Sequence, residues 1–503
     1  MSETQTSLSK DAAQLALGGG LVFVGSLLDK AFRLLIGLFL VRVFSVEDFG
    51  TYNYVIKTMT IVAVAAPMGQ DISMVFFGAR FRRSKEYSKL KGTFLLGVLL
   101  TICNTAVLTV ASILAIRAGW LGQPEHQPYL FTLVPIVAVM PLVLFMVSCL
   151  RSFKDMRGNV LAFQLVLPGS LLLGQLIGVG VLGGNVYTAL QVFIVAHVLT
   201  LVVATVRAWK HYGPLMRDRS IAPTFAPVQQ LTYAIPQGIM GLVYRLNVWM
   251  DVMMLGWLAN DREVGLYSVA VSLALLGVLP TISLNTMFNP VISELVQARD
   301  LVRLNQLLKL VTRWLLILSL PFFLFLLLLP DFALLIYGEQ YTESMRSLQL
   351  LALGQMVIAI FAPAMRIIPM SGYALLNLCN GIAALALAIT LNWLLIPQYG
   401  GLGAAAGTAL TLAAWSAWRL AEVHHLFRCS PFSSKTVLIG GFTAVLVGAS
   451  LWLTQGSSVW LRLAAYAAFV VVYVLFVWRF GRSPDDHLVT ERIRKRIRRL
   501  IKR

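Results

Sequence analysis

The sequence predicts an all-α polytopic membrane protein with 14 transmembrane helices, in two pseudo-symmetric six-helix lobes followed by a C-terminal helix pair. Composition is the first reason: 58% of the 503 residues are hydrophobic and 13% are charged, against about 25% charged residues in soluble chains. Mean hydropathy is +0.78. The second reason is that 14 apolar stretches are long enough to span a bilayer. No strand-like alternation recurs, so helices are expected to span.

The expected spans follow the apolar stretches in chain order. They cover about 13–43, 49–79, 92–116, 129–150, 158–182, 187–209, 231–258, 264–292, a stretch ending near Pro330, 344–368, 371–395, 403–420, 436–453 and 459–478. A polar linker with three prolines separates the first six from the rest. The predicted domains are an N-terminal lobe (1–209), a cytoplasmic linker (210–230), a C-terminal lobe (231–428), an appended helix pair (429–481) and a basic amphipathic tail (482–503).

The connections between these stretches alternate in charge. Every second one is rich in Lys and Arg, and the intervening ones are nearly free of both. This pattern follows the positive-inside rule and predicts that both termini are cytoplasmic. The net charge of +19 is therefore interpreted as orientation charge, and no nucleic-acid partner is expected. The tail is expected to lie on anionic lipid. The four cysteines lack any metal-ligand spacing and are expected to be free thiols.

The first expected span carries charge near its middle, at Asp29, Lys30 and Arg33. A helix over 13–43 is roughly 45 Å long, so these residues fall near the midplane of a hydrocarbon core about 30 Å thick. Each charged residue at that depth costs roughly 2.5–3.5 kcal/mol on insertion scales. Asp29 and Arg33 have the spacing and order of a helical ion pair. Two interpretations remain: an anion site in a water-filled passage, or a buried network that holds the bundle together.

Other polar residues lie within later spans. Lys57 and Arg245 are cations, and Arg245 is either an anion contact or a cation stacked on Trp249, one turn away. Asn247 and Asp251 share one helix face and suit either a coupling cation or the capping of a neighbouring helix. Further Asn and Gln side chains within the spans could bind sugar hydroxyls or make ordinary interhelical hydrogen bonds. Among them, Asn285 is expected to contact the substrate.

The two halves share a local pattern. A charged turn, an apolar residue, Gly, any residue and Tyr occur at 47–52 and again at 262–267. In each half a helix broken by proline follows, at Pro67 and at Pro280. Both copies start on the same side of the membrane, so the repeat is parallel, as in two-lobed transporters whose substrate passes between the lobes.

Four motifs carry a resemblance that covers nearly the whole chain. They are Leu-Val-Arg-Val-Phe at 40–44 with Phe-Gly-Thr-Tyr at 49–52, Asp251 with Leu-Gly at 255–256 and Val-Gly-Leu-Tyr at 264–267, Ile-Tyr-Gly-Glu-Gln-Tyr at 336–341 with Leu-Leu-Ala-Leu-Gly-Gln at 350–355, and Leu-Asn-Trp-Leu-Leu-Ile-Pro-Gln-Tyr-Gly at 391–400 with Gly-Ala-Ala at 403–405. On these motifs the chain resembles the polysaccharide-transporter branch of the MOP superfamily, the Wzx-type flippases of lipid-linked oligosaccharides.

The resemblance implies a flippase that moves an undecaprenyl-diphosphate-linked oligosaccharide from the cytoplasmic to the outer leaflet of a bacterial inner membrane. It implies a role in surface polysaccharide biosynthesis, such as O antigen or exopolysaccharide, with polymerase machinery as a partner. A diphosphate needs cations, and the expected contacts are Lys30, Arg33, Lys57 and Arg245.

Two other functions stay open. A cation-coupled drug antiporter of the same superfamily would favour acids over bases in its cavity. A non-transporting scaffold for glycan assembly would not need charge at the midplane. No cofactor, metal site or enzymatic activity is expected, because the sequence has no nucleotide-binding motif and no nucleophile–base constellation.

Overall fold

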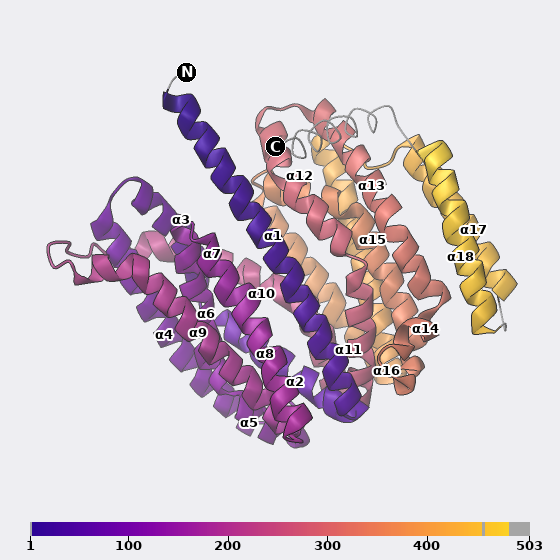
Figure 1. The fold of residues 1–503 in the computed structure, drawn as a ribbon, viewed down its shortest axis with the longest axis horizontal. Helices are drawn as coiled ribbons and strands as arrows, with labels where there is room; N and C mark the ends of the chain where they lie inside the picture. The colour runs from indigo at the N-terminus through magenta and orange to yellow at the C-terminus, as the bar shows by residue number, and fades with distance from the viewer. Residues whose placement is uncertain (1–2, 455–457, 482–503) are drawn as a thin grey trace. The chain divides into compact units, whose positions relative to one another are not determined.

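A computed structural model describes residues 3–454 and 458–481 of the chain (Figure 1). Helices make up almost all of this part, and no strand occurs within it. Nine of its helices are long and apolar enough to cross a membrane, or ten if α2 and α3 form one bent span. The prediction of an all-helical polytopic membrane protein is confirmed. The tail predicted at 482–503 lies outside the described residues, so its helix stays a prediction.

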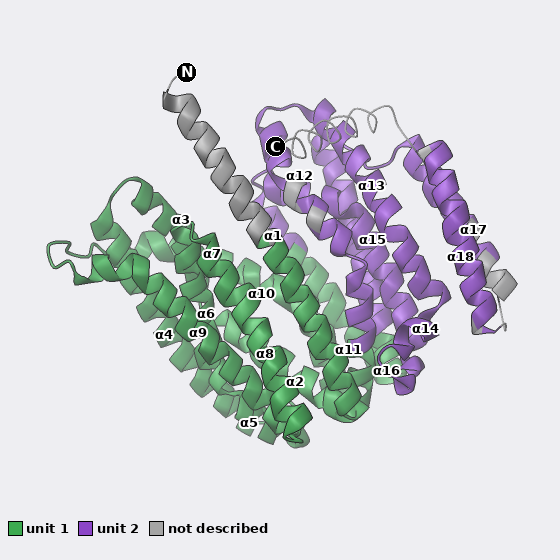
Figure 2. Cartoon of the chain, viewed as in Figure 1, with its two compact units in different colours: residues 1–268, 381–404 green, residues 269–380, 405–503 purple. Residues whose placement is uncertain are grey.

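The chain divides into two compact units, which Figure 2 colours separately. Unit 1 holds residues 1–268 and 381–404. Its helices are α1 (Glu3–Val43), α2 (Val46–Ala65), α3 (Gln70–Arg83), α4 (Tyr87–Arg117), η1 (Pro124–His126), α5 (Gln127–Leu133), α6 (Pro135–Ser152), α7 (Met156–Asn159), η2 (Val160–Val166), α8 (Leu167–Gln175), η3 (Leu176–Val181), α9 (Val186–Arg217), α10 (Pro227–Leu258) and the first part of α11 (Asp261–Leu276).

Unit 2 holds residues 269–380 and 405–503. Its helices are α12 (Leu279–Gln297), α13 (Leu301–Leu328), α14 (Pro330–Leu335), η4 (Glu339–Ser344), α15 (Met345–Met370), α17 (Ser434–Thr454), α18 (Val459–Phe476) and η5 (Val477–Gly481). The helix α16 (Ala374–Phe427) contributes segments to both units. The lobe boundaries expected from the sequence remain a proposal.

Both helix breaks expected at proline are confirmed. The helix α2 ends two residues before Pro67, and α3 starts after a turn, at an angle of 44° to α2. Proline has no backbone N–H to donate and its ring clashes with the preceding turn, so the helix ends there. Gly69 completes the turn with φ +79°, which glycine adopts without strain. In the second half, α11 ends at Leu276 and α12 begins one residue before Pro280.

In unit 1, α2 and α3 pack against α10 and α11 in antiparallel order, along what we call the α2–α10 seam. Glycines allow the backbones to touch at both ends of it. A Cβ atom added to Gly69 would lie 1.9 Å from the Ala234 carbonyl oxygen, and one added to Gly50 would lie 1.8 Å from that of Asp261. Gly50 and Gly265 are the glycines of the two sequence repeats, and a Cβ on Gly265 would lie 2.2 Å from the Val46 carbonyl oxygen. The repeated glycines therefore mark a helix crossing.

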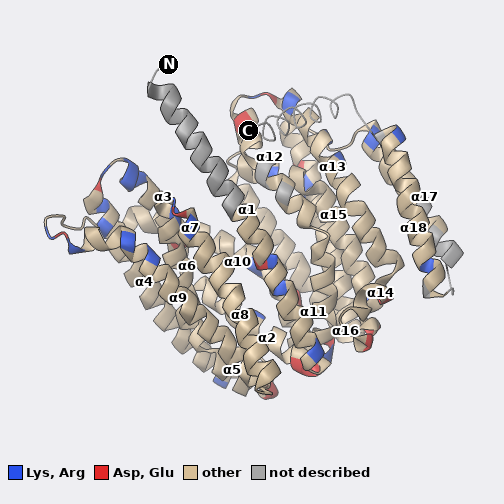
Figure 3. Cartoon of the chain, viewed as in Figure 1, with Lys and Arg blue, Asp and Glu red and all other residues tan. Residues whose placement is uncertain are grey.

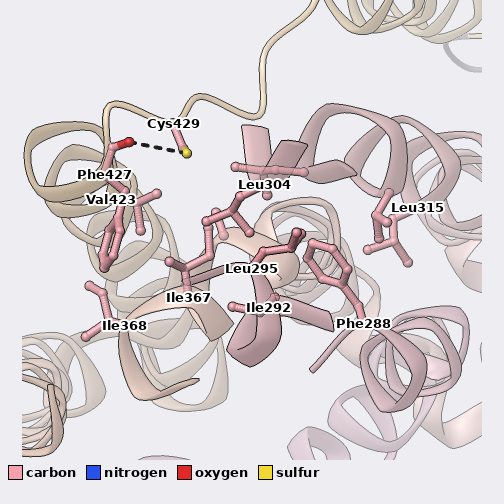
Figure 4. Packing of buried hydrophobic residues seen from close by; sticks show 13 residues of the cluster. Phe288, Ile292, Leu295, Leu304, Leu315, Ile367, Ile368, Val423, Phe427 and Cys429 are labelled. Carbon is pink, nitrogen blue, oxygen red and sulfur yellow. Dashed lines mark hydrogen bonds between the residues drawn. The ribbon is translucent and has the colours of Figure 1, made fainter. Parts of the chain in front are cut away.

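Unit 2 has an apolar core between α12, α13, α15 and α16, shown in Figure 4. Ile292, Leu304 and Ile367 are each fully buried there and come from three different helices. The four cysteines are free thiols, as expected, and the Sγ of Cys429 donates to the Phe427 carbonyl oxygen at 3.4 Å beside this core. Because lipid is as apolar as these side chains, close packing rather than water exclusion stabilises the contact.

The appended helix α18 is held to the rest of unit 2 by an ion pair. Arg462 on α18 donates from both Nη atoms to the carboxylate of Asp331 at the start of α14, at 3.2 and 2.5 Å. The two side chains are 24% and 15% exposed. A bidentate arginine–carboxylate contact fixes orientation as well as distance, so it specifies how α18 docks.

Candidate functional site

The first group of charges lies partway along α1, where Figure 3 shows acidic and basic residues away from the helix ends. Arg33 Nε donates to Asp29 Oδ1 at 2.9 Å, which confirms the expected ion pair. The Arg33 side chain is 49% exposed and that of Asp29 is 23% exposed. Lys30 is also exposed. The pair is therefore not sealed in a dry core of its unit.

The second group is a cluster of two cations around one indole ring. Lys57 Nζ on α2 lies 5.1 Å from the centre of the Trp249 ring on α10. Arg245 Cζ, one turn earlier on α10, lies 5.7 Å from the same ring. Stacking of Arg245 on Trp249 was one of the two interpretations of the sequence, and the structure has this contact. That Lys57 shares the ring was not foreseen, because sequence spacing does not report contacts between helices.

Neither cation has a closer polar partner in the part of the chain that the structure describes. No hydrogen bond or ion pair of Lys57 or Arg245 occurs there, and both side chains are half-buried. Longer-range charges act on them: Arg33 and Asp251 on Lys57, and Asp71 on Arg245. Lys57 thus lies within electrostatic reach of Arg33 and Asp251, and Arg245 within reach of Asp71.

Two of the residues proposed for ion coupling, Asn247 and Asp251, make hydrogen bonds within the protein. Asn247 Nδ2 donates to the Val243 carbonyl oxygen at 2.8 Å and to the Gly381 carbonyl oxygen at 3.0 Å. Asp251 is 9% exposed and accepts a hydrogen bond from the Tyr267 hydroxyl at 2.5 Å. The bond to Gly381 links α10 to α16. An ion-coupling role for Asp29, Asn247 and Asp251 stays a prediction.

Tyr267 was quoted as part of a repeat but was given no role by sequence reasoning. Its signal was present, because the Gly-x-Tyr pattern places it two residues after the crossing glycine, Gly265. The side chain of Tyr267 is fully buried. It bridges α11 to the Asp251 carboxylate on α10, so the repeat encodes a helix junction.

A second polar cluster, also missed from the sequence, lies where α2 crosses α11. The Asp261 carboxylate binds His126 Nε2 at 2.7 Å and accepts a hydrogen bond from the Thr51 hydroxyl. The His126 side chain is 1% exposed. Close by, Arg262 Nε pairs with Glu47 at 3.4 Å. One charged pair, Glu47 with Arg262, therefore joins one repeat to the other.

Asn285, the expected sugar contact, is on α12 in unit 2, whereas the other proposed contacts are in unit 1. It is 6% exposed, and its Oδ1 atom has no hydrogen-bond partner among the described residues. A buried amide oxygen without a partner is costly. Its role as a substrate contact remains a prediction.

Solved structures share this arrangement of helices. An inward-facing multidrug resistance MATE family transporter of the MOP superfamily matches with a TM-score of 0.68 and 13% identity, over 80% of this chain and 94% of that chain. The lipid II flippase MurJ in an inward closed conformation matches with a TM-score of 0.68 and 14% identity, over 93% and 100%. A MOP superfamily transporter from Pyrococcus furiosus matches with a TM-score of 0.58 and 14% identity, over 83% and 95%. The fold is that of MOP-superfamily transporters and flippases.

Sequence patterns of families lead to the same class. The pattern of the family described as "Polysaccharide biosynthesis protein" matches residues 15–296, more than half of the chain. The chain belongs to this polysaccharide-transporter family of the MOP superfamily. A second pattern, MatE, matches residues 236–395. No match was found among proteins of curated function. These relatives are transporters and flippases rather than enzymes.

Proposed function

We propose that the protein is a flippase that moves an undecaprenyl-diphosphate-linked oligosaccharide from the cytoplasmic to the outer leaflet of a bacterial inner membrane, for surface polysaccharide assembly by a partner polymerase. The observation that carries the proposal is the pair of cations at Trp249, each without a carboxylate partner in the described part of the chain. A half-buried cation within a membrane span carries a desolvation cost, and charged residues at that depth commonly mark the path of a charged substrate.

The proposed cargo supplies that anion. A diphosphate carries about two negative charges, and its transfer through a hydrocarbon core about 30 Å thick is prohibitive without compensation. Arg245 is suited to bidentate contact with phosphate oxygens, and Lys57 acts as a compact point charge. Lys30 and Arg33 would guide the headgroup along α1, and Asp29 limits how tightly Arg33 binds it. Asn285 is proposed as a contact of the sugar.

The proposed topology has 14 spans and cytoplasmic termini. Ten spans follow from helix length when α2 and α3 count as one. The long helix α16 has a break at Gly400, with φ 54° and ψ −132°, and counts as two spans on either side of it. The helix α1, the α11–α12 pair and α17 bring the total to 14. Positive-inside charge then orients the chain.

A cation-coupled drug antiporter is the second candidate, because the MatE pattern matches residues 236–395 and Asp251 is a buried acid in that segment. Purified protein in proteoliposomes separates the two. A lipid-linked oligosaccharide with a fluorescent sugar and the organic cation ethidium are offered in parallel, and leaflet exchange and uptake are measured. The proposal expects exchange of the lipid cargo and no ethidium uptake. Ethidium uptake driven by a proton or sodium gradient, without lipid exchange, would replace it by the antiporter.

A further inference from the structure

The α2–α10 seam has a regular antiparallel register. Gly69 lies against Ala234 at one end and Gly50 against Asp261 at the other, and Gly256 lies against the ring of Tyr54 in between. Lys57 and Trp249 face each other between the two end contacts. Their interaction is therefore a tie across the middle of the seam.

Arg245 adds a second cation to the same ring from within α10. Two cations at one indole repel each other, and neither has a hydrogen-bonded counter-ion in the described residues. Among the described residues, the Trp249 ring is the group that contacts both cations, whereas Asp251 acts on Lys57 and Asp71 on Arg245 from longer range. The arrangement suits a resting state in which the aromatic face of Trp249 holds the two cations until an anionic ligand binds them more strongly.

We propose that Trp249 is a positioning residue that holds Lys57 and Arg245 when no cargo is bound, and that the cargo diphosphate takes both cations from the ring and so unties α2 from α10. This inference rests on the proposed function, since it needs an anionic cargo at these two residues.

The exchange is favourable because charge-assisted hydrogen bonds to phosphate are stronger than a cation–π contact. It also links binding to movement. A ligand shifts a conformational equilibrium only through different affinities for the two states. Here the untied state offers two free cations to the diphosphate, whereas in the tied state Trp249 competes for them. Cargo binding therefore favours loosening of the seam.

The test uses full-length protein in nanodiscs and inorganic pyrophosphate as the probe. Trp249→Leu removes the aromatic face and Trp249→Phe keeps a weaker one. We expect Trp249→Leu to bind pyrophosphate about tenfold more tightly, because the indole ring no longer competes for the two cations; tenfold corresponds to about 1.4 kcal/mol. Trp249→Phe should fall between Trp249→Leu and the unchanged protein. Equal or weaker binding by both variants would overturn the proposal.

A second readout follows the seam itself. Spin labels at Val62 on α2 and Val248 on α10, with the four cysteines replaced by serine, report the distance between the helices. Pyrophosphate should lengthen this distance in the protein that retains Trp249, and Trp249→Leu should have the longer distance without it. If neither pyrophosphate nor Trp249→Leu changes the distance, Trp249 does not hold α2 to α10 and the proposal is wrong. If Trp249→Leu does not fold, Trp249→Phe must show smaller changes of the same sign in pyrophosphate affinity and in interspin distance.

Two variants separate this proposal from the proposed function. Lys57→Gln and Arg245→Gln should each abolish or strongly weaken pyrophosphate binding. If they do and Trp249→Leu fails to tighten it, only the positioning role of Trp249 is wrong. If neither changes binding, the anion site itself is wrong, and the proposed flippase mechanism loses its main support.

Discussion

The contact between α10 and the α2–α3 turn predicts opposite effects for two neighbouring Gly→Ala changes. A Cβ atom on Gly238 would lie 2.5 Å from the Met68 carbonyl carbon and 2.7 Å from the Gly69 nitrogen. A Cβ on Gly241, three residues later in the same helix, meets nothing within 4 Å. Alanine in a helix interior is favoured over glycine by about 0.5–1 kcal/mol. Overpacking against atoms that cannot move costs about 1–3 kcal/mol.

We therefore expect Gly241→Ala to be neutral or slightly stabilising and Gly238→Ala to be destabilising, with a difference of about 1–3 kcal/mol between them. Helix propensity cancels in that difference because both positions are in α10. Titration of the purified protein with SDS, followed by tryptophan fluorescence, measures the free energy of unfolding of each variant. Equal values for the two variants would show that α10 does not meet the α2–α3 turn so closely, and would remove the basis for the seam.

Three further predictions test other parts of the structure. Asp331→Asn and Arg462→Gln should each lower the free energy of unfolding by about 1–3 kcal/mol, and the double variant should lower it by less than the sum of the two. Additive losses in an SDS titration would mean that the pair does not hold α18. Arg33→Gln should reduce both abundance and transport because Asp29 loses its partner, whereas Asp29→Asn with Arg33→Gln should restore abundance only; normal transport by that double variant would make the pair structural. Alkaline phosphatase fused after Gly184 should be active, since this connection is expected outside the cytoplasm; an inactive, stable fusion would contradict the topology.

Sequence reasoning predicted what depends on local chemistry. Composition and span length gave the membrane class, and the two prolines marked helix breaks at the right places. The Asp29–Arg33 pair followed from helix periodicity alone. The motifs identified the family, because they extend along most of the chain.

Contacts between segments far apart in the chain could not be predicted from the sequence. The spacing of Arg245 and Trp249 suggested their stacking, but nothing local relates Lys57 to a ring 192 positions along. The same holds for His126 with Asp261 and for Arg462 with Asp331. The glycines of the repeats are evident in the sequence. The reason for them, close backbone contact between the two copies, can be recognised only from the structure.

The most direct test of the anion site is transport by charge-neutral variants in proteoliposomes. Lys57→Gln, Arg245→Gln and their double are compared with Arg117→Gln, which removes an exposed cation at the end of α4. The assay follows the leaflet exchange of a fluorescent undecaprenyl-diphosphate-linked oligosaccharide at matched protein abundance. The account predicts at least a tenfold loss of exchange for each single variant, more for the double, and none for Arg117→Gln, because loss of a charge-assisted phosphate contact costs about 1.5–3 kcal/mol. Unchanged exchange in the Lys57→Gln, Arg245→Gln double variant would contradict it.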